Sequence, residues 1–393
     1  MSITPAEDVL TSALVELKAQ NPSLGITKIH ALLLKQHPDW AVSEKRTKKI
    51  LKMEGLTSSA IPPDPNVVYP TSRLVPTLDV NKWTTKVRVK MFDKRKGKGL
   101  VATTDIQEGE MVWKEDPFVI AAEWDIYDLQ VTGQASRSAK VHPLLCQAQN
   151  PACAPLVKFI REREWMALNA LTHCVSRVLL ANQYDEATLR ADWDVMKGLA
   201  ALGMEERAKY SFNQAEPDRA TWKKAHQLIV QAFKEPKNPA DQKKLAKLLK
   251  KPLPLEVDQE FFEYDPGFLK NLGKMSLNLE AHGGLYTLHS HLNHSCAPNC
   301  SARHNEKRTA LSRISIIAKR PIAPGEELTV TYVNPELPYR SRQDELQAWG
   351  FGSCKCDRCV GEEKTFQLKD VLEDGQPDMH DLERELKAGL GVM

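Results

Sequence analysis

Three cysteines stand close together near the C-terminal end of the chain: Cys354, Cys356 and Cys359. Thiolates are the usual ligands of structural Zn²⁺, which takes four ligands in a tetrahedral arrangement. This segment therefore predicts a structural zinc site that needs one more ligand from elsewhere. The chain has 393 residues and 8 cysteines. That number is too small for a disulfide framework, so we expect reduced cysteines that bind metal.

Three further groups could bind a ligand or take part in catalysis. Asn293 stands beside His294, and an asparagine amide offers both a donor and an acceptor. Gly97 and Gly99 flank a lysine, and glycines let the backbone approach a ligand where a Cβ would prevent it. Tyr332 ends a β-like run that follows a Pro-Gly turn. Taken singly, the first pair favours turn capping, the glycines a plain turn, and the tyrosine a core position.

In their order along the chain, the three C-terminal motifs resemble the C-terminal half of a SET-domain lysine methyltransferase with its zinc-binding post-SET segment. The upstream segment Lys96–Ala102 resembles the Gly-x-Gly strand pair that opens a SET domain. The resemblance covers about residues 86–124 and 271–361 and is closest to split-SET enzymes of the SMYD type and their fungal relatives. The C-terminal motifs are Leu292–Asn299, Gly325–Tyr332 and Cys354–Cys359.

This resemblance implies an S-adenosylmethionine-dependent protein-lysine N-methyltransferase acting on histone lysines. Tyr332 would direct its hydroxyl at the junction of the lysine channel and the cofactor. Asn293 would bind the methionyl part of the cofactor, and His294 would present its backbone to the adenine. Lys98 would pair with the cofactor carboxylate. The implied cofactor contacts are Gly97, Lys98, Gly99, Asn278, Asn293, His294 and Phe351.

The resemblance also completes the zinc site and implies a threaded chain. The fourth ligand of a single structural zinc would be Cys296, with Cys300 as the rival ligand. Zinc would then clamp the post-SET segment over the cofactor motif, and the segment after that motif would thread a loop to form a pseudoknot. Phe351 stands three residues before Cys354, whereas SMYD relatives place their adenine-stacking aromatic two residues before the first cysteine.

Residues 1–56 have the pattern of a small helical unit that resembles a winged helix. Apolar positions follow the helical period in three segments, which are separated by breaks at Asn21-Pro22 and His37-Pro38. Lys45, Arg46, Lys48 and Lys49 give the third helix a basic face. Docking to a partner protein is favoured over DNA contact, because this unit is only weakly basic overall.

The remaining chain predicts a mixed α+β fold in which a helical insertion interrupts a SET domain of short β-sheets. SMYD enzymes carry a MYND zinc finger in this place, but Cys146, Cys153 and Cys174 are too few for its two zinc ions. The expected divisions are a linker at 57–85, SET halves at 86–124 and 271–335, the insertion at 125–270, the post-SET segment at 336–361, and a tail at 362–393.

The bulk composition excludes several other classes of protein. Hydrophobic residues make up 42% and charged residues 27% of the chain, and the formal net charge is +3, as in an ordinary globular protein. We expect no membrane span and no secretory signal, and therefore action in the nucleus, the cytoplasm or both. The competing functions are a non-catalytic chromatin-binding SET scaffold and a DNA-binding regulator directed by the N-terminal unit.

Overall fold

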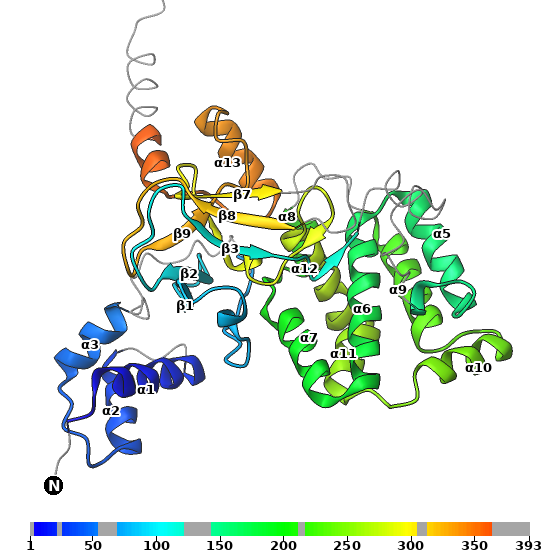
Figure 1. The fold of residues 1–393 in the computed structure, drawn as a ribbon, viewed down its shortest axis with the longest axis horizontal. Coiled ribbons are helices and arrows are strands. Elements are labelled where there is room, and N and C mark those ends of the chain that lie inside the picture. The colour runs from blue at the N-terminus through cyan, green and yellow to red at the C-terminus, as the bar shows by residue number, and fades with distance from the viewer. Residues whose placement is uncertain are drawn as a thin grey trace, which may run out of the picture.

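The described residues form a mixed α+β molecule with three short sheets, an N-terminal helical bundle and a larger helical body. Figure 1 shows the bundle at the lower left, the sheets above it and the helical body on the right. None of the helices in the described parts is long and apolar enough to cross a membrane. The computed structural model describes residues 4–21, 26–53, 69–121, 143–210, 217–304 and 313–363.

The N-terminal bundle consists of α1 (Glu7–Gln20), α2 (Ile26–Gln36) and α3 (Glu44–Met53). The Ser43 hydroxyl accepts a hydrogen bond from the Arg46 amide at 3.2 Å, as expected for a helix N-cap. Residues 54–68, where a wing would begin, lie outside the described part, so the winged-helix assignment stays a prediction. The bundle has an apolar core of its own, formed by Leu10, Leu14, Leu17, Ile29, Leu33, Val42, Ile50 and Leu51.

The two predicted SET halves, which lie far apart in the sequence, meet in a four-stranded sheet with the order β1-β2-β9-β6. Strand β2 is buried along its whole length and pairs antiparallel with both β1 and β9. Strand β6 pairs with β9 in parallel. The strands are β1 (Val87–Met91), β2 (Lys98–Ala102), β6 (Asn293–His294) and β9 (Glu327–Val330).

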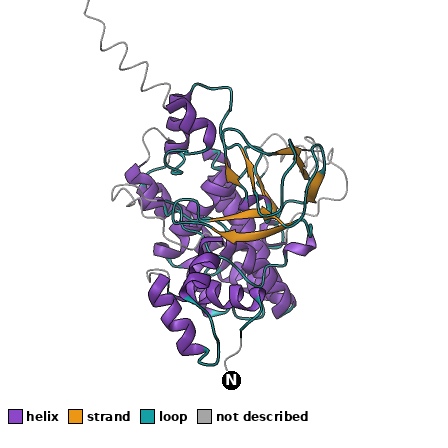
Figure 2. Cartoon of the chain, turned by 90° about the vertical axis from the view of Figure 1, so that its left-hand side faces the viewer, coloured by secondary structure: helices purple, strands orange, loops and turns teal. Residues whose placement is uncertain are grey.

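The other two sheets join the same two halves. A three-stranded sheet has the order β3-β8-β7, and a two-stranded sheet pairs β4 with β5. Figure 2 shows the strands gathered on one side of the helical body. These strands are β3 (Met111–Glu115), β4 (Val119–Ile120), β5 (Gly284–Leu285), β7 (Cys300–His304) and β8 (Ile314–Ala318).

The insertion is helical, as predicted, and forms most of the larger apolar core. Side-chain caps begin three of its described helices: Asp185 accepts from the Thr188 amide, Asp218 from the Thr221 amide, and Asn238 from the Ala240 amide. Short helical turns occur at Pro143–Leu145, Pro151–Cys153 and Tyr264–Phe268. The helices are α5 (Ala154–Arg163), α6 (Met166–Tyr184), α7 (Glu186–Gly198), α8 (Met204–Tyr210), α9 (Arg219–Phe233), α10 (Pro239–Leu248), α11 (Leu255–Phe262) and α12 (Leu269–Asn278).

Two of the expected divisions differ from the structure. The boundary at residue 270 falls inside α12, which packs against α6 and therefore belongs to the helical body. The predicted linker is not a free connector over its described part. Thr71 forms a β-bridge with Ala201, with N–O distances of 2.7 and 2.8 Å. A segment rich in proline has joined the fold as extended backbone, which is the conformation that proline favours.

The post-SET segment contains α13 (Tyr339–Ala348) and a helical turn at residues 357–363. Gln343 of α13 fixes the segment between these helices, because its side chain accepts from the Cys354 amide at 2.7 Å and donates to the Cys354 carbonyl at 3.2 Å. The first two residues of the predicted tail, Glu362 and Glu363, belong to the helical turn.

Candidate functional site

The parallel pairing of β6 with β9 brings the asparagine–histidine motif beside the catalytic candidate. Asn293 lies opposite Thr329, and His294 lies opposite Val330. Tyr332 follows β9, and its backbone amide donates to Nδ1 of His294 at 3.0 Å. The structure therefore joins two motifs that stand 38 residues apart. The threading of the segment after this motif through a loop, to form a pseudoknot, stays a prediction.

Tyr332 lies between two aromatic rings, and its hydroxyl is held in place. The hydroxyl donates to the Leu292 carbonyl at 2.5 Å. The ring centroid is 5.3 Å from that of His294 and 4.8 Å from that of Phe351. Burial of the hydroxyl end, with the nearby carboxylate of Glu280, raises the pKa of Tyr332. The hydroxyl therefore stays protonated at neutral pH and remains a hydrogen-bond donor.

The two glycines before and within β2 keep space that a side chain would fill. Gly97 has φ +67°, and a Cβ there would lie 2.3 Å from the Ser72 hydroxyl. A Cβ on Gly99 would lie 2.7 Å from Nδ2 of Asn293 and 3.0 Å from Oε1 of Glu327. Nδ2 of Asn293 donates to that carboxylate at 2.8 Å. Gly99 thus makes room for the contact that orients Asn293.

Lys98 lies between these glycines and has a buried side chain. Its ammonium donates to the Gly198 carbonyl and lies 2.9 Å from Nε2 of His291. These two partners, a backbone carbonyl and an imidazole, are not anions. Burial, with the nearby positive charge of Lys274, lowers the pKa of Lys98 to about 7. The positive charge of the Lys98 side chain is therefore not balanced by these partners, and the side chain is well suited to bind a carboxylate.

Asn278 lies at the end of α12 and holds the same wall of the site as Lys98. Its Nδ2 donates to the Ala200 carbonyl at 2.8 Å and to the Lys274 carbonyl at 2.7 Å. The segment 198–200, which begins at the last residue of α7, is therefore fixed by Lys98 of β2 and by Asn278 of α12. The sequence did not indicate this wall, because a carbonyl group carries no signal in residue type.

Glu115 is a functional candidate that sequence reasoning missed. It ends β3 with only 1% of its surface exposed, and its carboxylate accepts from the amides of Leu288 and His289 at 2.7 and 3.0 Å. Burial raises its pKa to about 7, although these hydrogen bonds act in the opposite direction. Glu115 thereby anchors the turn that leads into β6. A single glutamate at a strand end has no distinguishing pattern.

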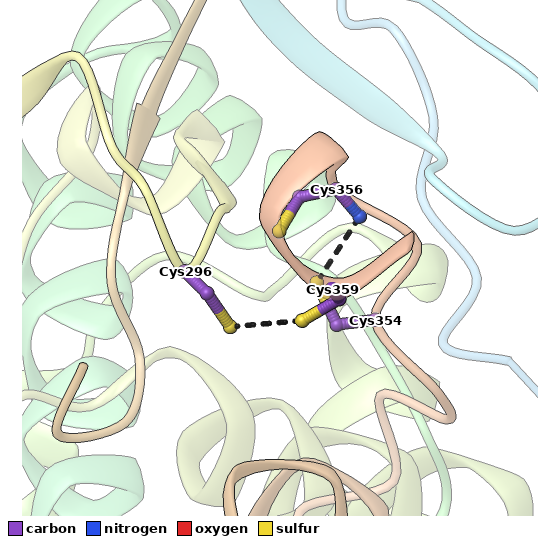
Figure 3. Close-up of side chains that lie close together, drawn as sticks. All are labelled: Cys296, Cys354, Cys356 and Cys359. Carbon is purple, nitrogen blue, oxygen red and sulfur yellow. Dashed lines mark hydrogen bonds between the residues drawn. The ribbon is translucent and has the colours of Figure 1, made fainter. Parts of the chain in front are cut away.

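Four thiols meet where the resemblance placed a zinc site. The sulfur atoms of Cys296, Cys354, Cys356 and Cys359 all lie within 4.8 Å of one another. Figure 3 shows Cys296 and Cys359 facing each other from two separate segments, with their sulfurs 3.4 Å apart. Tetrahedral Zn²⁺ with Zn–S bonds of about 2.3 Å places sulfurs about 3.8 Å apart. The cluster can therefore hold one zinc ion. The rival, Cys300, pairs with Ala318 in the β7–β8 ladder and lies outside it.

A buried arginine supports the thiol cluster from α13. Arg342 has no exposed surface, and its Nε donates to the sulfur of Cys296 at 3.3 Å. Its Nη2 lies 3.9 Å from the sulfur of Cys359 and forms an ion pair with Glu362. A guanidinium in this position compensates the negative charge of four thiolates. The sequence analysis did not predict it.

Comparison with known proteins agrees with the geometry. Residues 97–333 match the family described as "SET domain". "Histone-lysine N-methyltransferase SET5" of Yarrowia lipolytica is 30% identical over 412 residues, which cover 93% of this chain and 84% of the relative. The protein of the same name from Candida albicans is 27% identical over 98% of this chain and 87% of its own.

A solved structure titled "Crystal structure of the SET domain of LSMT bound to Lysine and AdoHcy" aligns with a TM-score of 0.35 and 12% identity. The alignment covers 67% of this chain and 52% of that one. The family match spans more than half of the chain and contains the glycine pair, the β6 motif and the tyrosine. The chain belongs to the SET-domain family.

Proposed function

We propose that the protein is an S-adenosylmethionine-dependent protein-lysine N-methyltransferase that acts on histone lysines. One observation carries the proposal: Asn293, His294 and Tyr332 meet at the β6–β9 pair inside the matched SET region. All three have side chains competent for the roles that the family assigns. The two fungal relatives, named as histone-lysine N-methyltransferases, support the substrate class.

The residues around β2 and β6 fit the proposed cofactor. Lys98 is a buried cation that contacts the Gly198 carbonyl and His291, and it would bind the carboxylate of the cofactor. Asn293 and His294 would bind the methionyl part and the adenine, and the glycines keep the backbone accessible. Phe351 and Asn278 stay candidate contacts. S-Adenosylmethionine, when bound, supplies an electrophilic methyl group on a sulfonium.

Tyr332 would position the substrate amine. A lysine amine must lose a proton before it can attack, because its ordinary pKa is about 10.4. A desolvated site favours the neutral amine, and the protonated Tyr332 hydroxyl can orient it beside the Leu292 carbonyl. Alignment of the reacting groups is the main contribution that such a site makes to an in-line displacement. Zinc at the four cysteines would hold the post-SET segment, including Phe351, against this tyrosine.

The N-terminal bundle would dock the enzyme on a nucleosome or a partner protein. Lys45, Lys48 and Lys49 are exposed on α3, whereas Arg46 is half-buried and donates to the Pro5 carbonyl at 3.2 Å. Three exposed cations on one helix can approach an acidic protein surface or a phosphate backbone. Action in the nucleus is part of this proposal.

The proposal is tested by incubating the purified protein with labelled S-adenosylmethionine and a panel of core histones. Mass spectrometry of the products then identifies the modified residue and the number of methyl groups. Tyr332→Phe should lower turnover by about a hundredfold, or about 3 kcal/mol on the barrier, while cofactor affinity and melting temperature change little. Histone binding without any methyl transfer would instead support the non-catalytic scaffold.

A further inference from the structure

A second group of potential metal ligands lies away from the cysteines. Glu280 follows α12, His282 lies in the turn before β5, and His304 ends β7. One ligand atom from each lies within 4.8 Å of the other two. All three side chains are half-buried. The three residues come from the junction between the helical body and the three-stranded sheet.

Neighbouring side chains hold this cluster in place. The imidazole rings of His282 and His304 have centroids 4.3 Å apart and are inclined at 69°. Nε2 of His282 lies 2.9 Å from the Tyr286 hydroxyl. Nδ1 of His289 lies 3.2 Å from Oε1 of Glu280. A histidine that donates to a ligating carboxylate orients that carboxylate, as outer partners do in many metal sites.

One buried atom of the cluster lacks a partner in the described part of the chain. Nδ1 of His304 has no hydrogen-bond partner among the residues that the structure describes. An unsatisfied buried polar atom destabilises the fold, and an ion or a water that binds it is one explanation for its position. Neighbours outside the cluster pair with Glu280 and with Nε2 of His282, whereas Nδ1 of His304 is left unpaired among the described residues. The cluster is therefore better explained as part of a ligand site than as a closed hydrogen-bond network.

We propose that Glu280, His282 and His304 bind a divalent transition-metal ion, of which Zn²⁺ is the representative, at a site separate from the cysteine cluster. Two imidazoles and a carboxylate form a borderline ligand set that suits Zn²⁺ and its neighbours. Bonds of about 2.0–2.1 Å place tetrahedral ligand atoms about 3.3 Å apart. Side-chain rotations that shift the ligand atoms by about 1.5 Å or less would therefore bring them to the distances of a bound ion. A water completes the coordination.

Metal at this site would join the helical body to the SET sheets. Glu280 and His282 belong to the connection from α12 to β5, whereas His304 belongs to a strand paired with β8. A bound ion would therefore restrict movement between these two parts of the fold and would stabilise the folded protein by mass action. Binding of metal at these three residues can be measured directly and does not require methyl transfer.

The test uses the full chain with its cysteine site loaded with zinc. Equilibrium dialysis against buffered Zn²⁺, followed by elemental analysis, measures bound metal in the wild type, in the His282→Gln/His304→Gln double variant and in Glu280→Gln. His30→Gln, a histidine in the N-terminal bundle, is the matched control. We expect a second bound zinc in the wild type and the control, and at least about a 100-fold loss of affinity at this site in the other two variants.

A second zinc retained at full affinity in the folded double variant would overturn the assignment, as would a wild type that binds zinc only at its cysteines. Retention of the first zinc and the melting temperature show whether each variant is folded. Should the double variant fail to fold, electron paramagnetic resonance of Cu²⁺ added to the zinc-loaded wild type decides. Coupling to imidazole nitrogens supports the site, and bound copper without such coupling, or no bound copper, refutes it.

Discussion

Replacing Arg342 by leucine tests whether charge compensation holds the zinc site together. The guanidinium is fully buried, donates to the sulfur of Cys296, lies near the sulfur of Cys359 and pairs with Glu362. Leucine can fill part of the volume but offers no positive charge. The zinc–thiolate cluster, which is still negatively charged because four thiolates surround one Zn²⁺, and the Glu362 carboxylate would then lack the guanidinium that lies between them.

The size of the effect follows from these contacts. Removing one partner of a buried ion pair costs about 3–5 kcal/mol. The Glu362 side chain is 35% exposed, so water can partly replace the arginine. We therefore expect the free energy of unfolding to fall by about 2–4 kcal/mol. Loss of an outer partner weakens metal affinity by about 10–100-fold in comparable sites. We therefore expect Arg342→Leu to bind zinc about 10–100-fold more weakly.

Competition with a chromogenic chelator measures this affinity directly. Arg342→Lys should recover part of the loss, since it restores the charge but not the fork of donors. Arg340→Lys is the matched control, because Arg340 is exposed on the same helix. Wild-type zinc affinity in a folded Arg342→Leu protein would refute the argument that the guanidinium compensates the thiolates.

Three further outcomes can be measured. Asn293→Ala should weaken S-adenosylmethionine binding by about 1–3 kcal/mol in calorimetry, and unchanged affinity in a folded variant would remove Asn293 from the site. The pKa of Glu115 is raised from 4.5 to about 7, so the folded state binds the extra proton between these values. The free energy of unfolding should therefore fall by roughly 3 kcal/mol as pH rises through this window, and urea titrations of Glu115→Gln should lack this component. The pKa of Lys98 is lowered to about 7, so binding of a carboxylate should raise it and take up a proton near pH 8. Calorimetry in buffers of different ionisation heat should detect this uptake in the wild type and not in Lys98→Met.

The parts of the site that the sequence predicted are those in which side-chain type and spacing carry the information. Cys354, Cys356 and Cys359 predicted a metal site by themselves, and the resemblance supplied Cys296. The structure brings all four together. Gly99 and the β6 motif also lie in one sheet, and Gly97 directly precedes its strand β2.

The parts that could not be predicted depend on distant backbone. Lys98 faces the Gly198 carbonyl, 100 residues away, and no property of the glycine residue announces that contact. Glu115 and Arg342 were missed because a lone charged residue in an element of mixed pattern is usually exposed. The contact that fixes the described part of the predicted linker could not be foreseen for a related reason. Proline predicts extended backbone, but the β-bridge of Thr71 to Ala201 depends on where the insertion folds.

The insertion has a direct consequence for how the site is assembled. Lys98 and Asn293 come from the two SET segments, whereas the segment 198–200 that meets Lys98 begins at the last residue of α7, a helix of the insertion. A cofactor carboxylate at Lys98 would therefore contact a site built from three parts of the chain. The buried ammonium is costly until such an anion arrives, because its present partners are neutral. The insertion thus shapes the proposed cofactor site, and changes in the packing of α7 or α12 should alter cofactor affinity even though α7 holds none of the residues that the resemblance assigns to the cofactor.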